Sequence, residues 1–455
     1  MNRNDESKVK TPSQPTRVAA TPMQAGETRD RWWWVERSIW TERMLTRLTP
    51  GESANRVWYS LMDKTYTPAN LARAFDKVWQ KDGCAGADAQ TVTHFARHAE
   101  KELTRLHEQL RAGTYRPQPV RRAWIDKPGS KEKRPLGIPA VRDRVVQAAL
   151  RHVLEPIFET EFAEQSYGFR PGRGAKDALR RVDTLLKTGH GWVVDADLKS
   201  YFDTIPQERL QALVKARVAD GRVLALVERF LRAGVLEAGK GWQPTESGTP
   251  QGGVISPLLA NLYLNPLDHH MAKAGWEMVR YADDFVILCR SQAEAQLALD
   301  LVKAWVAGAG LTLHPEKTRV VNATQLGGFD FLGYHFERGM RWPRKKSLGK
   351  LKDRVRAQTS RLDGRRLQEI VADLNRTLRG WYGYFQHSSA KTFEIVDGYV
   401  RRRLRSLLQW RRDGRGKGKG AVDQRWPNAW FAHCGLLSLK TEHEWTRTIV
   451  KLRKH

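Results

Sequence analysis

The chain has 455 residues, a mass of 52.1 kDa and a formal net charge of +28. Hydrophobic residues make up 40% of it, which excludes a disordered protein and is enough for several domains with their own cores. So large a basic excess predicts a polyanionic partner, because lysine and arginine release counterions when they neutralise phosphates. Three widely spaced cysteines support neither a zinc finger nor a disulfide framework and favour a reducing compartment.

Residues 1–66 are an N-terminal extension, polar and expected to be disordered to about residue 28 and helical beyond it. The chain opens without an apolar signal core, and no apolar run approaches the roughly 20 residues that a bilayer span requires. We therefore expect no membrane partner. Residues 67–120 form a second, helical segment, because Thr67-Pro68 is typical of a helix start and apolar residues recur at helical spacing from Val92 to Leu110.

Between residues 121 and 343, short β-like runs alternate with helices, and some of the runs are linked as hairpins. This pattern predicts an α+β fold with an antiparallel sheet and disfavours a doubly wound parallel sheet. Residues 344–410 are predicted to be helical, with an apolar stripe from Leu367 to Leu378.

Basic residues concentrate at the C-terminal end. Residues 341–455 hold 29 Lys/Arg and 10 Asp/Glu, a net charge of +19, whereas the other 340 residues carry only +9. Residues 411–455 begin with the basic loop RRDGRGKGKG, which is typical of a flexible segment. We expect this C-terminal tail to bind nucleic acid.

Two acidic motifs indicate metal chemistry. Asp283 and Asp284 lie between two β-like runs, and Asp195 and Asp197 share one face at the end of a third. Adjacent carboxylates raise each other's pKa, and a divalent cation relieves that repulsion. Mg²⁺ prefers oxygen ligands and leaves coordination positions for substrate phosphate. A solvated turn would explain Asp-Asp alone, but a second acidic strand beside it is the layout of a phosphoryl-transfer site with two Mg²⁺ ions.

Eight motifs follow one another along most of the chain: KPG with RPLGIP (127–139), SYGFRPGR (166–173), DLKSYFD (197–203), GTPQGGVISP (248–257), YADD (281–284), HPEKT (314–318), FLGY (331–334) and LRGWYGYF (378–385). In this order they resemble the reverse transcriptases encoded by bacterial group II introns. The resemblance implies a right-hand polymerase, with fingers and palm at 121–343 and an α-helical thumb and maturase domain, domain X, at 344–410.

The resemblance also implies a function. Such a protein is an RNA-directed DNA polymerase that binds its intron RNA to assist splicing and copies that RNA during retrohoming, by two-metal-ion nucleotidyl transfer. Its partners would be group II intron RNA, a DNA target or primer and dNTPs, and it would work in the bacterial cytoplasm, associated with the nucleoid. Whether it acts as a homodimer stays open.

The family pattern assigns roles to single residues. Asp197, Asp283 and Asp284 match the catalytic triad that binds the two Mg²⁺ ions. Phe202 matches the aromatic gate under the nucleotide sugar, where a flat ring leaves no room for a 2′-hydroxyl. The other residues expected to bind the nucleotide are Lys127, Arg134, Gln251 and Lys317. For Lys317 a solvated surface lysine is the alternative.

SYGFRPGR (166–173) resembles the family's template-handling motif, and Leu348 to Val355 are expected to form a thumb-like helix. Nucleic-acid contacts are expected at basic residues of this motif, this helix and the C-terminal region. These residues are Arg170, Arg173, Lys350, Arg354, Arg401, Arg402, Arg411, Arg412, Arg415, Lys417 and Lys419.

About 35 residues follow the basic loop and contain one cysteine and no pair, so we expect no HNH-type endonuclease domain. In this respect the chain resembles the compact C-subclass introns. Two alternatives remain: a splicing-only maturase with a vestigial polymerase, and a host-defence or diversity-generating reverse transcriptase. The intact triad argues against the first, and PQGG with the domain X-like stretch argues against the second.

Overall fold

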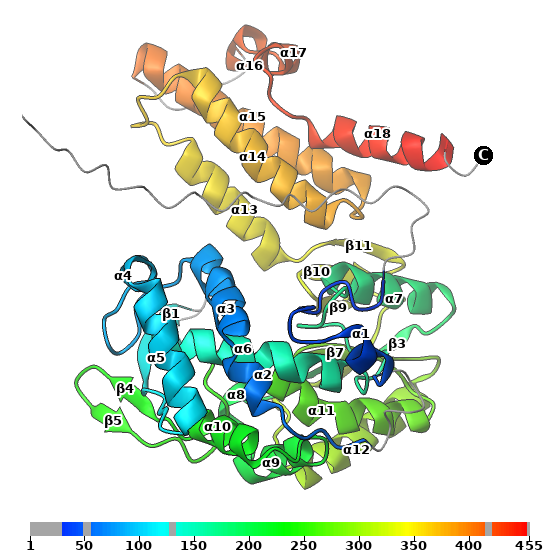
Figure 1. Ribbon diagram of the computed structural model, residues 1–455. Coiled ribbons are helices and arrows are strands. Elements are labelled where there is room, and N and C mark those ends of the chain that lie inside the picture. The colour runs from blue at the N-terminus through cyan, green and yellow to red at the C-terminus, as the bar shows by residue number, and fades with distance from the viewer. Residues whose placement is uncertain (1–29, 49–55, 127–132, 415–420, 453–455) are drawn as a thin grey trace, which may run out of the picture. The chain divides into compact units, whose positions relative to one another are not determined.

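The structure is a computed structural model that describes residues 30–48, 56–126, 133–414 and 421–452 (Figure 1). The chain forms two compact units, Met1–Val35 and Glu36–His455. In the first unit the described residues form turns, and the rings of Trp32 and Trp34 lie 6.0 Å apart. All named helices and strands belong to the second unit.

The second unit begins with five helices: α1 (Glu42–Thr46), α2 (Met62–Tyr66), α3 (Pro68–Lys81), α4 (Val92–Arg97) and α5 (Ala99–Ala112). The helix start predicted at Thr67-Pro68 is confirmed, because the Thr67 hydroxyl accepts a hydrogen bond from the Asn70 amide at 3.3 Å. Buried Asn70 then attaches α3 to α6 (Val141–Glu159) through its bonds to the Ala149 carbonyl and the His152 ring. The helix expected from Val92 to Leu110 is instead two helices, interrupted at His98.

Strands form three sheets. We name two of them after the regions to which the resemblance assigns them: the fingers sheet has the order β2-β1-β4-β5 and the palm sheet β6-β7-β3-β8, while the small sheet has the order β11-β10-β9. Their bounds are β1 (Val120–Asp126), β2 (Lys133–Ile138), β3 (Trp192–Asp197), β4 (Val235–Glu237), β5 (Gly241–Gln243), β6 (Glu277–Tyr281), β7 (Asp284–Cys289), β8 (Arg319–Asn322), β9 (Phe329–Phe331), β10 (Tyr334–Glu337) and β11 (Met340–Pro343). All neighbours in the palm sheet are antiparallel, which confirms the predicted α+β class. The fingers sheet contains one parallel pair, β1 with β4.

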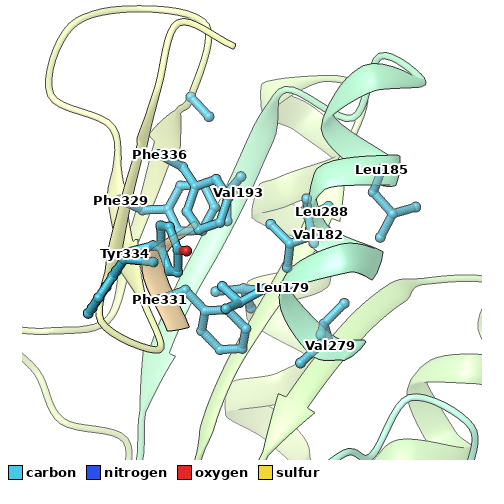
Figure 2. Packing of buried hydrophobic residues seen from close by; sticks show 14 residues of the cluster. Leu179, Val182, Leu185, Val193, Val279, Leu288, Phe329, Phe331, Tyr334 and Phe336 are labelled. Atoms are coloured by element: carbon cyan, nitrogen blue, oxygen red, sulfur yellow. The ribbon is translucent and has the colours of Figure 1, made fainter. Parts of the chain in front are cut away.

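Helices pack around these sheets: α7 (Ala175–Lys187), α8 (Tyr201–Thr204), α9 (Gln207–Lys215), α10 (Gly221–Leu231), α11 (Ser256–Lys273) and α12 (Gln292–Gly308). Figure 2 shows one core cluster, in which residues of α7, the palm sheet and the small sheet converge. Val193 of β3 and Val182 of α7 are fully buried there, and the rings of Phe329 and Phe336 stack 5.1 Å apart. This core packs against β3 and β7, the two inner strands of the palm sheet.

The C-terminal helices are α13 (Lys345–Gln358), α14 (Leu367–Phe385), α15 (Ala390–Asp413), α16 (Ala421–Arg425), α17 (Asn428–His433) and α18 (Leu439–Leu452). They have a core of their own, to which the predicted stripe on α14 contributes Ile370, Leu374 and Leu378. None of the helices in the described ranges is both long and apolar enough to cross a membrane.

The small sheet and α14 are joined by two tyrosines. The Tyr334 hydroxyl donates to the Tyr384 carbonyl at 2.8 Å, and the Tyr384 hydroxyl donates to the Leu332 carbonyl at 2.7 Å. The Phe385 ring lies 4.9 Å from that of Tyr334 and belongs to the same core cluster as the palm sheet. The helical region is therefore continuous with the core beneath the palm.

Candidate active site

Three carboxylates meet where two palm strands end. In the antiparallel register of β3 and β7, Asp197 is the direct partner of Asp284, and Asp283 precedes it in the β6–β7 turn. We call Asp197, Asp283 and Asp284 the palm carboxylates. Asp195 lies two residues earlier on β3, on the face that Asp197 shares. The expected arrangement of an acidic strand beside an Asp-Asp hairpin is confirmed.

The turn that carries Asp283 has a constrained backbone. Ala282 has a φ of +61°, in the left-handed region that residues with a Cβ rarely adopt. Gly168 of the SYGFRPGR motif packs directly against it, and a Cβ at position 168 would lie 2.4 Å from the Ala282 nitrogen. The template-handling motif and the acidic turn are thus in van der Waals contact, and this contact requires glycine at position 168.

The palm carboxylates repel one another in a partly buried setting. Burial raises the pKa of Asp284 to about 7, and the charges of Asp195, Asp283 and Asp197 add to the effect. Burial also raises the pKa of Asp283, with a further contribution from Asp197 that Arg134 partly offsets. The repulsion inferred from the sequence is therefore present, and cations are needed to relieve it.

The residues present fit Mg²⁺ that binds together with a substrate. Among the described residues, no three His, Cys, Asp or Glu side chains converge closely enough to hold a metal ion by themselves. Mg²⁺ nevertheless usually takes one or two carboxylates and completes its shell with water and substrate phosphates. The carboxylate oxygens of Asp197, Asp283 and Asp284 are donors of the kind that Mg²⁺ prefers, and their mutual repulsion would be relieved by a divalent cation between them.

Lys317 lies at this site and not on a remote surface. Its Nζ donates a hydrogen bond to Oδ2 of Asp197 at 2.5 Å, although the lysine side chain remains 60% exposed. A backbone hydrogen bond keeps the HPEKT segment beside the end of β3, because the His314 amide donates to the Asp197 carbonyl at 2.7 Å. Lys317 thus supplies one positive charge to the palm carboxylates. Its contact with a nucleotide stays a prediction.

The predicted nucleotide pocket is assembled from three separate segments. Phe202 lies on α8, and its carbonyl accepts a hydrogen bond from the Thr249 amide of the GTPQGG loop at 2.7 Å. The same loop is joined to the fingers, because the Gly137 amide of β2 donates to the Gln251 carbonyl at 2.7 Å. Arg134, exposed on β2, is close enough to lower the pKa of Asp283. Lys127 lies outside the described residues.

Two glycines allow this assembly. Gly248 has a φ of +80°, and a Cβ there would lie 2.6 Å from the Phe202 carbonyl oxygen. Gly252 has a φ of +122°, and a Cβ there would lie 2.3 Å from the Gly137 carbonyl oxygen. Behind the loop is a cavity of about 640 Å³, lined in part by Lys77, Arg144 and Phe169.

The predicted nucleic-acid contacts divide into buried and exposed residues. Arg170 is only 7% exposed, and its guanidinium donates to Glu159 and to the carbonyls of Ala163 and Ser166. This arginine braces the template-handling segment, so the expectation that it contacts nucleic acid is not supported. Arg173 is half-buried and paired with Glu164 at 2.5 Å.

Most of the other predicted contacts lie on the surface of the C-terminal helices. Lys350, Arg354, Arg402, Arg411 and Arg412 are exposed, and Arg401 is half-buried. The remaining three, Arg415, Lys417 and Lys419, lie outside the described residues.

Sequence reasoning missed a polar cluster under the acidic turn. Arg280 on β6 is fully buried and is bonded to Asp268 and Asn261 of α11. Two signals could have revealed it: an arginine inside the apolar run MVRYA, and polar residues at helical spacing in NLYLNPLDHH.

Two families match the chain in succession. The reverse transcriptase (RNA-dependent DNA polymerase) family matches residues 125–336, and the group II intron, maturase-specific domain matches residues 348–426. Protein YkfC of Escherichia coli (strain K12) is 34% identical over 292 residues, which cover 56% of this chain and 76% of that protein. The group II intron-encoded protein LtrA of Lactococcus lactis subsp. cremoris is 44% identical over 172 residues, which cover 37% of this chain and 28% of that protein.

Similarity to solved structures is weaker. A telomerase structure from Candida albicans covers 70% of this chain at 12% identity, the chain covers 64% of it, and the TM-score is 0.39. A likeness at this level carries no argument about function.

Proposed function

We propose, from the premise that this chain belongs to the group II intron-encoded reverse transcriptases with a maturase-specific domain, that it copies its intron RNA during retrohoming and assists the splicing of that RNA. The chain is an RNA-directed DNA polymerase by family. Two-metal catalysis, the use of dNTPs and the choice of RNA are the parts that we propose.

The observation that carries the proposal is the pairing of Asp197 with Asp284 across β3 and β7, with Asp283 adjacent in the turn. In the proposed reaction these carboxylates hold two Mg²⁺ ions. When bound, the ions would activate the 3′-hydroxyl of the primer and neutralise the pyrophosphate that leaves. The partial burial of the carboxylates strengthens their attraction for cations, because charges interact more strongly where water is excluded.

Basic side chains of this chain would bind the triphosphate. Arg134 on β2 lies close enough to lower the pKa of Asp283, and its planar guanidinium can donate two parallel hydrogen bonds to a phosphate. The Gly137–Gln251 backbone bond holds this strand against the nucleotide loop, so a nucleotide bound there would contact both. When substrate binds, Lys317 would release Asp197 and bind a phosphate instead. The Asp197 carboxylate would then be available to a metal ion.

Phe202 would set the preference for deoxyribonucleotides. Its backbone is tied to the nucleotide loop through Thr249, and the ring of Tyr201 contacts its own edge-on at a centroid distance of 5.6 Å. The bond to Thr249 holds the backbone from which the ring projects, and the contact with Tyr201 restricts the ring on one side. The proposed selectivity is therefore steric.

RNA would be held by two surfaces. The exposed basic residues of α13 and α15, including Lys350, Arg354 and Arg402, would bind phosphates of the intron RNA. The cavity behind the nucleotide loop, with Lys77 and Arg144 in its lining and exposed Phe169 as an aromatic surface, would receive the template strand.

The test uses precursor RNA that carries the intron flanking this reading frame, and it follows splicing and cDNA synthesis separately. Wild type should accelerate splicing and should extend a DNA primer on the intron RNA with Mg²⁺ and dNTPs. Asp284→Asn should lose extension and keep splicing assistance, because the basic surface supplies RNA affinity. Splicing assistance without extension by wild type would identify a splicing-only maturase. Extension without splicing assistance would contradict the maturase part of the proposal.

A further inference from the structure

A buried polar cluster lies directly beneath the acidic turn. Arg280 and Asp268 are both 0% exposed. The Arg280 guanidinium donates from Nε to Oδ1 of Asp268 at 2.8 Å and from Nη2 to Oδ2 at 2.5 Å. Its Nη1 donates to Oδ1 of Asn261 at 3.0 Å and to the carbonyl of Ala282 at 2.9 Å. A charge is tolerated in this core because its donors have partners.

The bond to Ala282 controls the peptide that enters the acidic pair. Ala282 has a left-handed backbone, which surrounding contacts must maintain. Its carbonyl belongs to the peptide unit that joins it to Asp283. By accepting from Arg280, this carbonyl fixes the rotation of that peptide and with it the direction in which the Asp283 side chain leaves the turn.

The cluster is one part of a polar face on α11. Asn261, Asn265 and Asp268 follow each other at helical spacing. The Asn261 side-chain amide donates from Nδ2 to the Gly168 carbonyl at 2.7 Å, and Oδ1 of Asn265 accepts from the backbone amide of Ala163 at 3.1 Å. The same helix therefore holds the template-handling segment.

The first residue of α11 holds the nucleotide loop as well. The Ser256 hydroxyl donates to the Pro250 carbonyl at 2.8 Å and accepts from the Thr249 hydroxyl at 2.8 Å. Three parts of the site, namely the nucleotide loop, the template-handling segment and the acidic turn, are bonded to one helix. A shift of α11 would move all three together.

We propose that Arg280 is a positioning residue for the polymerase reaction, which holds Asp283 and Asp284 in register with Asp197 and couples their placement to the template-handling segment through Asn261. This inference rests on the proposed polymerase function. A purely structural ion pair would stabilise the fold without setting the metal requirement. If the ion pair is replaced and the fold stays stable, a purely structural role predicts unchanged catalysis, whereas a positioning role predicts a lower kcat and a higher Mg²⁺ requirement.

The main variant replaces both charges at once, Arg280→Met with Asp268→Leu. Removing one partner alone would leave an uncompensated buried charge, whereas apolar residues of similar volume in both places are often neutral for stability. Whether or not its stability changes, the double variant lacks the hydrogen bonds from Arg280 to Ala282 and Asn261. A matched control is Arg341→Met with Asp183→Leu, which removes a partly buried ion pair of 2.9 Å between β11 and α7, away from the turn.

The readouts are the thermal unfolding midpoint, template–primer affinity and primer extension as a function of Mg²⁺ concentration, below the unfolding temperature of every variant. The double variant should stay folded and bind template–primer within about twofold of wild type. Its kcat should fall about 10²-fold, the cost of a misplacement near 1 Å. Its half-saturating Mg²⁺ concentration should rise about tenfold, as expected when metal ligands lose their supporting hydrogen bonds. The control should show neither change.

A second variant guards against a folding failure of the first. Arg280→Lys keeps the positive charge beside Asp268 but replaces the planar fork with one ammonium, which cannot reproduce all four bonds. It should lower kcat and raise the Mg²⁺ requirement in the same direction. A folded variant of either kind with wild-type kcat and wild-type Mg²⁺ dependence overturns the proposal. If wild type itself does not extend primers, the proposed function fails instead.

Discussion

Carboxylates of the palm lie in an electrostatic environment opposite to that of Asp363, in the loop between α13 and α14, and Asp373, on α14. Burial and like charge raise the pKa of Asp284 to about 7. Hydrogen bonds from Arg365 lower the pKa of Asp363 to about 2, and the same arginine lowers the pKa of Asp373. The palm therefore concentrates negative charge that Lys317 compensates only in part, whereas the helical region neutralises its acids and presents an excess of basic residues.

This difference separates catalysis from affinity. The anionic site exerts its effect on a few reacting atoms, while the basic surface acts through many solvated contacts that are individually weak. Substitutions in the palm should change rates with little effect on RNA binding. Substitutions on the C-terminal helices should do the reverse.

The largest effect is expected from removing a palm carboxylate. Asp283→Ala and Asp284→Ala should each reduce primer extension at least about 10³-fold, because the charge that develops in the transition state loses its stabilising partners. Intron RNA affinity, measured by filter binding, should change less than about twofold. Asp195→Asn on the same strand is the control and should keep most activity. Extension at wild-type rates by Asp283→Ala would refute the assignment.

Phe202→Val should weaken sugar discrimination without affecting RNA binding. Opening space beneath the sugar should raise rNTP incorporation relative to dNTP incorporation by about 10- to 100-fold, within the range that packing differences supply. The measurement is kcat/KM for dATP and ATP on one template. Tyr201→Phe, which removes a hydroxyl bonded to the Ala260 carbonyl at 2.6 Å, is the matched control. An unchanged ratio in Phe202→Val would show that another residue is the gate.

Lowering the pH should weaken Mg²⁺ binding, because the Asp284 carboxylate becomes protonated. Its raised pKa of about 7 means that the carboxylate is protonated as pH falls below 7, and metal must then displace the proton. The half-saturating Mg²⁺ concentration of primer extension should be constant above about pH 8 and rise about tenfold per unit below about pH 6.5. Asp195→Asn should move this rise to lower pH, because Asp195 is one of the charges that raise the pKa. A flat profile from about pH 6 to about pH 8.5 would contradict the prediction.

The smallest effect is expected from exposed cations of the C-terminal helices. Lys350→Gln, Arg354→Gln and Arg402→Gln together should flatten the dependence of log K on log[salt] by roughly 0.7 to 0.9 for each phosphate that is no longer neutralised. Extension on a short pre-annealed duplex should change little. Neutralising three exposed arginines outside α13 and α15, Arg37, Arg97 and Arg180, provides the control. Equal salt slopes for wild type and the triple variant would place the RNA elsewhere.

Motifs and strand periodicity predicted the acidic site well. Asp195 and Asp197 share a face because a strand alternates with a period of two, and YADD between two apolar runs specifies a hairpin. The apolar stripe on α14 followed from helical spacing in the same way. In these cases the information is local in the sequence.

Interactions between distant segments escaped prediction. Lys317 and Asp197 are 120 residues apart, and nothing in either motif indicates their ion pair. Arg170 was expected to contact nucleic acid, but it is buried and paired with Glu159 on the preceding helix. The parallel pairing of β1 with β4 and the break of the predicted helix at His98 likewise depend on tertiary packing.

The two hydrogen bonds between tyrosines of the small sheet and α14 limit the exchange of polymerase and maturase segments between related proteins. Two families match this chain, but Tyr334, Tyr384 and Phe385 share one interior across the boundary between them. A gene fusion that joined this polymerase to a foreign maturase segment would have to preserve both sides of that interior. The two segments should therefore be inherited as a pair, and chimeras cut near residue 344 should be insoluble unless the small sheet travels with α14.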